Sequence, residues 1–151
     1  MMMDSQQMAE LGRMGALAAV GLGGLGSAVG VSIAGRAAVG AWKKAYALGR
    51  PAPFTLMTFI GAPMSQTIYG MILMFTMIGK ADSGYDPFAL LGVGFFAGLA
   101  IGVSAWMQGA AGAACADALA ETGEGFTNYL SVIGIVETVA IFVMVFTIIA
   151  L

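Results

Sequence analysis

Residues 133–149 form an apolar run of transmembrane length that contains one carboxylate, Glu137. Burying an ionised carboxylate at bilayer depth costs at least ~2.5–3.5 kcal/mol on insertion scales. This cost must be offset by a proton, a bound cation or a partner charge. The rest of the chain is therefore expected to supply what Glu137 needs.

The composition extends this constraint to the whole chain. Of its 151 residues, 60% are hydrophobic and 9% are charged, whereas a soluble domain carries about a quarter charged residues. The chain is thus predicted to be an all-α integral membrane protein. Because one spanning helix takes ~20 apolar residues, four spans fit, and we place them at residues 11–48, 54–78, 88–120 and 127–151.

The same composition argues against several classes of partner and site. The formal net charge of −2 is too small to suggest a nucleic-acid partner, and no basic cluster suggests one either. The single cysteine, Cys115, excludes an intramolecular disulfide. The sequence has no histidine, so it offers neither an imidazole metal ligand nor a histidine proton relay.

Small residues dominate the first and third spans. In the first span, Gly26, Gly30, Ala34 and Ala38 recur every four residues and line one helix face. Such faces let helix backbones approach closely in lipid. A helix this thin suits the crowded inner side of a ring.

Two short motifs recur with an offset of 71 residues (66 to 137, and 75 to 146). Gln66-Thr67 corresponds to Glu137-Thr138, and residues 75–78 correspond to 146–149. This repeat predicts two fused helical hairpins, residues 1–80 and 81–151. The second hairpin keeps the carboxylate, and the first has an amide in its place.

Hairpin geometry predicts which polar residues share the depth of Glu137. In a helical hairpin, residues equidistant from the turn lie at the same depth in the membrane. With the turn near residue 122, Gln108 and Glu137 are expected at the same depth. The repeat assigns Gln66 the corresponding depth on the second span. Pro63 lies just before it and should kink the helix or free a nearby backbone carbonyl.

The polar groups expected around Glu137 all offer oxygen atoms as possible ligands for a cation. They are the amides of Gln66 and Gln108, the hydroxyls of Ser65, Thr67, Tyr69 and Thr138, and a free carbonyl at Gly61 or Ala62. Hard cations prefer oxygen ligands, and one negative charge suits a monovalent cation better than Ca²⁺ or Mg²⁺. A site for a proton alone needs an apolar pocket and not two glutamines. The inventory therefore favours Na⁺ over H⁺, which stays the alternative.

At these residues the chain resembles the proteolipid (K-type or c-type) subunits of V-type and A-type rotary ATPases. The resemblance covers residues 10–151 and is strongest to the bacterial sodium-translocating members. It rests on the two glycine-rich hairpins, Ser65-Gln66 after Pro63, Gln108-Gly109 and Val136-Glu137-Thr138. It implies that Glu137, Gln108, Gln66 and Ser65 bind Na⁺, with Thr67, Tyr69, Thr138 and the Ala62 carbonyl around them.

The resemblance also implies an assembly. Identical subunits would form a rotor ring in lipid, with the first and third spans inside, as a non-catalytic part of a complex that couples ion transport to ATP hydrolysis or synthesis. A stator subunit would present a cationic residue, typically Arg, to Glu137. A central-stalk subunit would dock on the loops between spans 1 and 2 and between spans 3 and 4.

The positive charges predict the orientation in the cell membrane. Lys43, Lys44 and Arg50 cluster at the connection between the first two spans, and basic loops favour the cytoplasm. We expect the 1–2 and 3–4 loops in the cytoplasm and both termini outside.

Two other functions fit parts of the sequence. A small proton-coupled secondary transporter could use Glu137 at its substrate site, and it would need a cavity with aromatic or further charged residues at the midplane. A purely structural protein with four spans would tolerate Glu137→Gln, because the amide could still form hydrogen bonds.

Overall fold

The computed structural model describes residues 4–151; residues 1–3, which belong to the first predicted hairpin, lie outside the described residues. The chain forms α1 (Ser5–Ala47), α2 (Met57–Gly61), α3 (Ser65–Asp82), α4 (Pro87–Thr122) and α5 (Phe126–Ala150). Short 3₁₀ turns at Phe54–Leu56 and Ala62–Met64 flank α2. Residues 4–151 contain no strand, and the predicted all-α fold class is confirmed.

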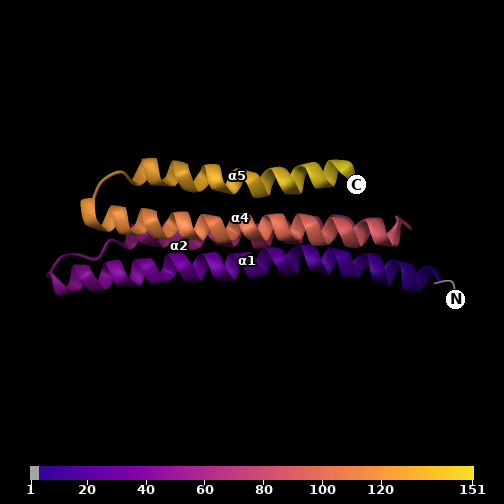
Figure 1. Ribbon diagram of the computed structural model, residues 1–151, viewed down its shortest axis with the longest axis horizontal. Helices are drawn as coiled ribbons and strands as arrows, with labels where there is room; N and C mark the ends of the chain where they lie inside the picture. The colour runs from indigo at the N-terminus through magenta and orange to yellow at the C-terminus, as the bar shows by residue number, and fades with distance from the viewer. Residues whose placement is uncertain (1–3) are drawn as a thin grey trace.

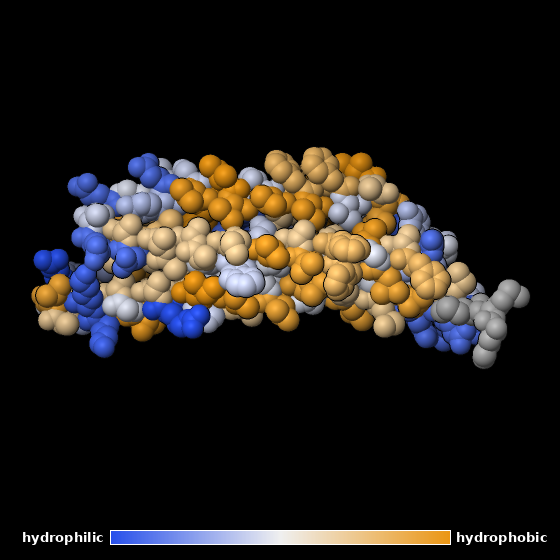
Figure 2. Space-filling model, in the orientation of Figure 1, coloured by the Kyte–Doolittle hydropathy of each residue, from blue (hydrophilic) through white to orange (hydrophobic). Residues whose placement is uncertain are grey.

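Four helical segments are long and apolar enough to cross a membrane: Ser5–Ala47, Phe54–Asp82, Pro87–Thr122 and Phe126–Ala150. The predicted number of spans is therefore confirmed. On the face shown in Figure 2, most side chains in the middle of the molecule are apolar, and hydrophilic ones gather towards its two ends. At 1.5 Å per residue, the 43 residues of α1 extend roughly 65 Å, about twice the hydrocarbon thickness of a bilayer, so α1 projects beyond it.

The helix α1 begins at Ser5 and not at residue 11 as predicted. The reason is a capping box at Asp4, which satisfies backbone N–H groups that a helix start leaves free. The Gln7 backbone N–H donates to Asp4 Oδ1 at 2.8 Å, and the Asp4 backbone N–H donates to Gln7 Oε1 at 3.1 Å.

The spans alternate in direction. Figure 1 shows both termini and the α3–α4 connection at one end of the molecule, with the α1–α2 and α4–α5 connections at the other. An exposed ion pair joins α1 to a neighbouring helix at each end: Arg13 to Asp82 at 2.7 Å, and Lys44 to Glu121 at 2.6 Å. Which end faces the cytoplasm stays a prediction.

The backbones of α1 and α4 touch along a row of glycines. A Cβ added to Gly26 would lie 2.0 Å from the Gly102 carbonyl oxygen, and one added to Gly109 would lie 2.2 Å from Gly30. The predicted face of small residues is confirmed: Gly26, Gly30, Ala34 and Ala38 are all buried. The glycine-rich helices α1 and α4 therefore form the closely packed centre against which α3 and α5 lie.

Pro63 interrupts the second span, as predicted. It has no N–H to donate to the carbonyl one turn earlier, and residues 62–64 form a 3₁₀ turn between α2 and α3. The Ala62 carbonyl accepts hydrogen bonds from the Ser65 backbone N–H and, at 3.0 Å, from Ser65 Oγ. The break thus lies immediately before Ser65-Gln66.

Candidate functional site

A polar layer separates two apolar clusters along the bundle. One cluster is centred on Leu73, Leu90 and Ile101, and the other on Leu56, Phe59 and Ala116. Between them lie the buried polar residues Ser27 of α1, Gln66 of α3, and Ser104 and Gln108 of α4. On α5, Glu137 lies between Ile133 of one cluster and Ala140 of the other.

Side chains from three helices join in one hydrogen-bonded chain across this layer. Gln66 Nε2 donates to Gln108 Oε1 at 2.8 Å, and Gln108 Nε2 donates to Glu137 Oε2 at 3.4 Å. Tyr69 Oη donates to Glu137 Oε1 at 2.5 Å. The predicted equal depth of Gln66, Gln108 and Glu137 is confirmed, whereas their role in binding an ion stays a prediction.

Both oxygens of the Glu137 carboxylate accept hydrogen bonds, one from a phenol and one from an amide. Hydrogen bonds to an ionised acceptor are stronger than those between neutral groups. Glu137 belongs to neither of the ion pairs found within residues 4–151. The chain therefore offers its carboxylate polar donors in place of a partner charge.

Ser65 brings three oxygen atoms together at the helix break. Its Oγ lies 3.0 Å from the Ala62 carbonyl oxygen and 3.2 Å from Gln66 Oε1. Because a hydroxyl has one hydrogen, it donates to one of these two acceptors at a time. The Ala62 carbonyl, at the Pro63 break, thus lies beside the Ser65 hydroxyl and the Gln66 amide that the sequence indicated.

Two predicted neighbours of the site have other surroundings. Thr138 Oγ1 donates to the Ile135 carbonyl of its own helix at 2.7 Å. Thr67 lies against α1, where a Cβ on Gly24 would be 3.8 Å from its Oγ1. Within residues 4–151, the side chains that are hydrogen-bonded to Glu137 are those of Tyr69 and Gln108, and neither threonine is among them.

The structure also reveals contacts that the sequence reasoning missed. Tyr69, expected only near the site, bonds the carboxylate directly. Ser104 Oγ donates to the Val136 carbonyl at 3.2 Å, and Gln108 Nε2 also donates to the Ile133 carbonyl at 3.0 Å. Spacing was the available signal, since residues three or four apart share a helix face: Tyr69 follows Gln66 by three positions and Ser104 precedes Gln108 by four.

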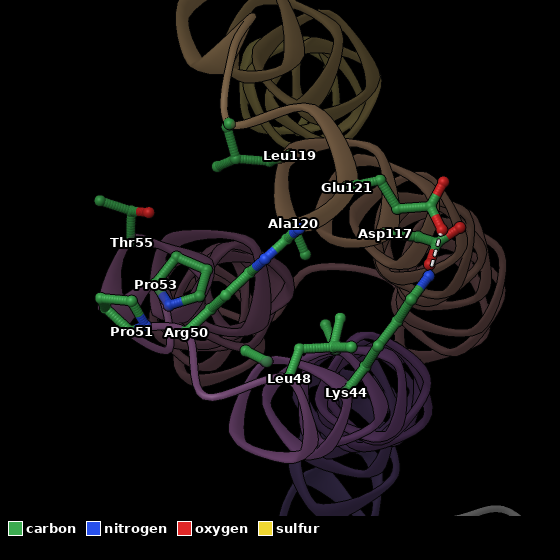
Figure 3. Close-up of a pocket in the computed structure, with 13 residues that line it drawn as sticks. Lys44, Leu48, Arg50, Pro51, Pro53, Thr55, Asp117, Leu119, Ala120 and Glu121 are labelled. Atoms are coloured by element: carbon green, nitrogen blue, oxygen red, sulfur yellow. Dashed lines mark hydrogen bonds and ion pairs between the residues drawn. The ribbon is translucent and has the colours of Figure 1, made fainter.

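Two hollows in the surface of the molecule lie away from Glu137. A cavity of about 470 Å³ opens at the end with the α1–α2 and α4–α5 connections, where Arg50 reaches across towards Ala120 and Lys44 pairs with Glu121 (Figure 3). An apolar groove of about 700 Å³ runs between α4 and α5, lined by residues such as Phe96, Phe142 and Phe146. Glu137 lines neither of them.

Comparisons with known proteins match the part of the chain that carries the carboxylate. Residues 91–150 match the family model that describes the C subunit of ATP synthase; this stretch includes Gln108 and Glu137. The chain is also 34% identical over 142 residues to the A-type ATP synthase subunit K of Methanocaldococcus jannaschii. That match covers 93% of this chain and 61% of the relative, so the chain spans less than two thirds of the relative's length.

Proposed function

Because the chain belongs to the family of ATP synthase C subunits, as its resemblance to the proteolipid subunits predicted, we propose that it is a membrane rotor subunit of an A/V-type rotary ATPase. In this proposal Glu137 binds an ion and carries it across the membrane. The subunit itself is non-catalytic, and other subunits hydrolyse or synthesise ATP.

One observation carries the proposal. A single carboxylate lies halfway along a bundle of membrane-length helices, between two apolar clusters, and both its oxygens accept hydrogen bonds from Tyr69 and Gln108. Such a residue is expensive at bilayer depth and typically marks an ion pathway. A reversible ion site explains why the sequence keeps it.

The donor set supports Na⁺ as the ion, with H⁺ as the alternative. Glu137 supplies the negative charge, and Gln66 and Gln108 supply amide oxygens that reach the same layer. Ser65 and the Ala62 carbonyl lie beside Gln66 Oε1. Oxygen ligands suit a hard cation, and a bound Na⁺ would replace the hydrogen bonds that now satisfy these oxygens.

The assembly we propose is a ring of copies in lipid, with α1 and α4 inside and α3 and α5 outside. Large apolar side chains on α5 support this arrangement, because Phe146 and Ile149 are 64% and 74% exposed in the single chain. A stator subunit would bring a cationic residue to Glu137. A central-stalk subunit would dock on the α1–α2 and α4–α5 connections, at the cytoplasmic face of the cell membrane.

The test is the reaction of Glu137 with a hydrophobic carbodiimide, titrated with NaCl or KCl at several pH values in detergent. The reagent modifies protonated carboxyls in apolar surroundings. We expect labelling of Glu137 that millimolar Na⁺ suppresses and K⁺ does not. Labelling that does not depend on the Na⁺ concentration would indicate a proton-carrying rotor. No labelling at any pH would contradict the proposal for Na⁺ and for H⁺ alike.

The variant Glu137→Gln separates the rotor from the alternatives. It should abolish labelling and ion transport while the protein still assembles, because the amide keeps most of the hydrogen bonds but cannot hold a charge. Surviving transport would refute the rotor and favour a structural protein. The secondary transporter is less well supported, because neither cavity described above opens on Glu137.

A further inference from the structure

The rotation of α5 about its own axis decides where Glu137 points. Apolar residues of α5 lie on all faces of the helix, and only two of its residues, Ile133 and Ala140, are buried. Lipid tails are as apolar as the side chains, so apolar burial in a membrane favours no particular face of such a helix. Specific contacts must therefore set its rotation.

Three side chains of α4 provide such contacts with the backbone of α5. Ser104 Oγ donates to the Val136 carbonyl at 3.2 Å, and Gln108 Nε2 donates to the Ile133 carbonyl at 3.0 Å. Cys115 Sγ lies 3.9 Å from the Tyr129 carbonyl and is a weaker donor. The residue numbers of the donors on α4 increase (104, 108, 115) while those of their acceptors on α5 decrease (136, 133, 129). The contacts therefore form a ladder between two antiparallel helices.

This ladder lies on the α5 face next to Glu137. Val136, whose carbonyl accepts from Ser104, comes one residue before Glu137 in the chain. Ile133, whose carbonyl accepts from Gln108, comes about one helical turn before it. A helix turns about 100° per residue, so a small rotation of α5 would carry the Glu137 side chain away from both Tyr69 and Gln108. A buried donor that holds the Val136 carbonyl opposes this rotation.

We propose that Ser104 is a positioning residue for the ion site, acting through the backbone of α5 and not through the ion. Ser104 is 6% exposed and contacts the Val136 carbonyl, whereas Gln108 bonds both the backbone and the carboxylate. Removing the Ser104 hydroxyl therefore tests positioning alone. When the readout is protection of Glu137 by Na⁺, the positioning role of Ser104 rests on the proposed function, in which Glu137 binds Na⁺.

The experiment compares carbodiimide labelling of Glu137 in the full-length chain in detergent with that in Ser104→Ala, over a range of NaCl concentrations. Ser104→Ala should raise the Na⁺ concentration that protects half of Glu137 by about threefold to fifteenfold, the equivalent of one interhelical hydrogen bond in a membrane protein. Ser104→Cys keeps a weak donor of similar shape and should restore part of the affinity.

The matched control is Ser131→Ala on α5. Ser131 Oγ donates to the Thr127 carbonyl of its own helix at 2.9 Å and is exposed, so half-protection should stay at the wild-type value. Equal half-protection in Ser104→Ala and wild type, or equal shifts in Ser104→Ala and Ser131→Ala, would overturn the positioning role.

A second readout separates this proposal from the proposed function. If wild-type Glu137 is labelled but Na⁺ does not protect it, the proposal that Glu137 carries Na⁺ is refuted, and the positioning role of Ser104 can still be tested. The rate of labelling against pH in Na⁺-free buffer should then differ between Ser104→Ala and wild type and match wild type in Ser131→Ala. Superimposable profiles for all three proteins would overturn the positioning role independently of the ion.

Discussion

Gly26→Ala tests whether the backbone contact between α1 and α4 holds the bundle together. A Cβ at this position would lie 2.0 Å from the Gly102 carbonyl oxygen and 2.4 Å from the Gly102 Cα. Real Cβ contacts essentially never fall below 3.0 Å. The two helices must therefore move apart by about 1 Å, and no change of rotamer can relieve a clash with backbone atoms.

The magnitude follows from the contacts that this separation weakens. A gap of 0.5–1 Å forfeits about a quarter to a half of each dispersion contact, and overpacking a well-packed core typically costs about 1–3 kcal/mol. The clash involves backbone on both sides, so we take a cost of about 3 kcal/mol. Replacing glycine by alanine in a helix returns about 1 kcal/mol. The expected net loss in the free energy of unfolding is about 2 kcal/mol, or roughly thirtyfold in the unfolding equilibrium.

The assay is unfolding of the detergent-solubilised protein by sodium dodecyl sulfate, followed by the fluorescence of its two tryptophans, Trp42 and Trp106. Gly21→Ala is the matched control on the same helix, because a Cβ there would meet nothing within 4 Å. It should leave stability unchanged or raise it by up to about 1 kcal/mol. If Gly26→Ala proves as stable as Gly21→Ala, the glycine row does not hold α1 against α4.

Two further variants test the polar layer and the molecular ends. Gln66→Leu removes the donor to the buried Gln108 Oε1 and should lower the free energy of unfolding by about 1–3 kcal/mol in the same titration; an equal loss in the exposed control Gln6→Leu would contradict this. Lys44→Ala removes an ion pair with Glu121 whose side chains are 63% and 55% exposed. It should leave the unfolding midpoint unchanged, because water screens such pairs, and a clear fall would show that the pair stabilises the fold.

Much of the fold and part of the site could be predicted from local patterns. The four spans followed from composition, and the break at Pro63 followed from its missing N–H. Counting residues from the hairpin turn was enough to predict that Gln108 and Glu137 lie at the same depth. The start of α1 was missed, because a capping box at Asp4 extends the helix through residues that are not apolar.

At the polar site, depth and helical face are different kinds of information, and the sequence by itself determined only the depth of the polar residues. Depth depends on the number of residues from a turn, which is a local property, so the chain alone shows that Gln66, Gln108 and Glu137 share a layer. Which hydroxyl meets the carboxylate depends on how each helix is rotated.

Only the tertiary structure decided that rotation. The glycine contact between α1 and α4 brings these backbones together, and the α4 side chains then hold the carbonyls of α5. As a result Tyr69 bonds Glu137, while the hydroxyls of Thr67 and Thr138, equally close to the site in sequence, turn elsewhere. Successive helical residues differ by about 100° in direction, so packing between helices had to select among them.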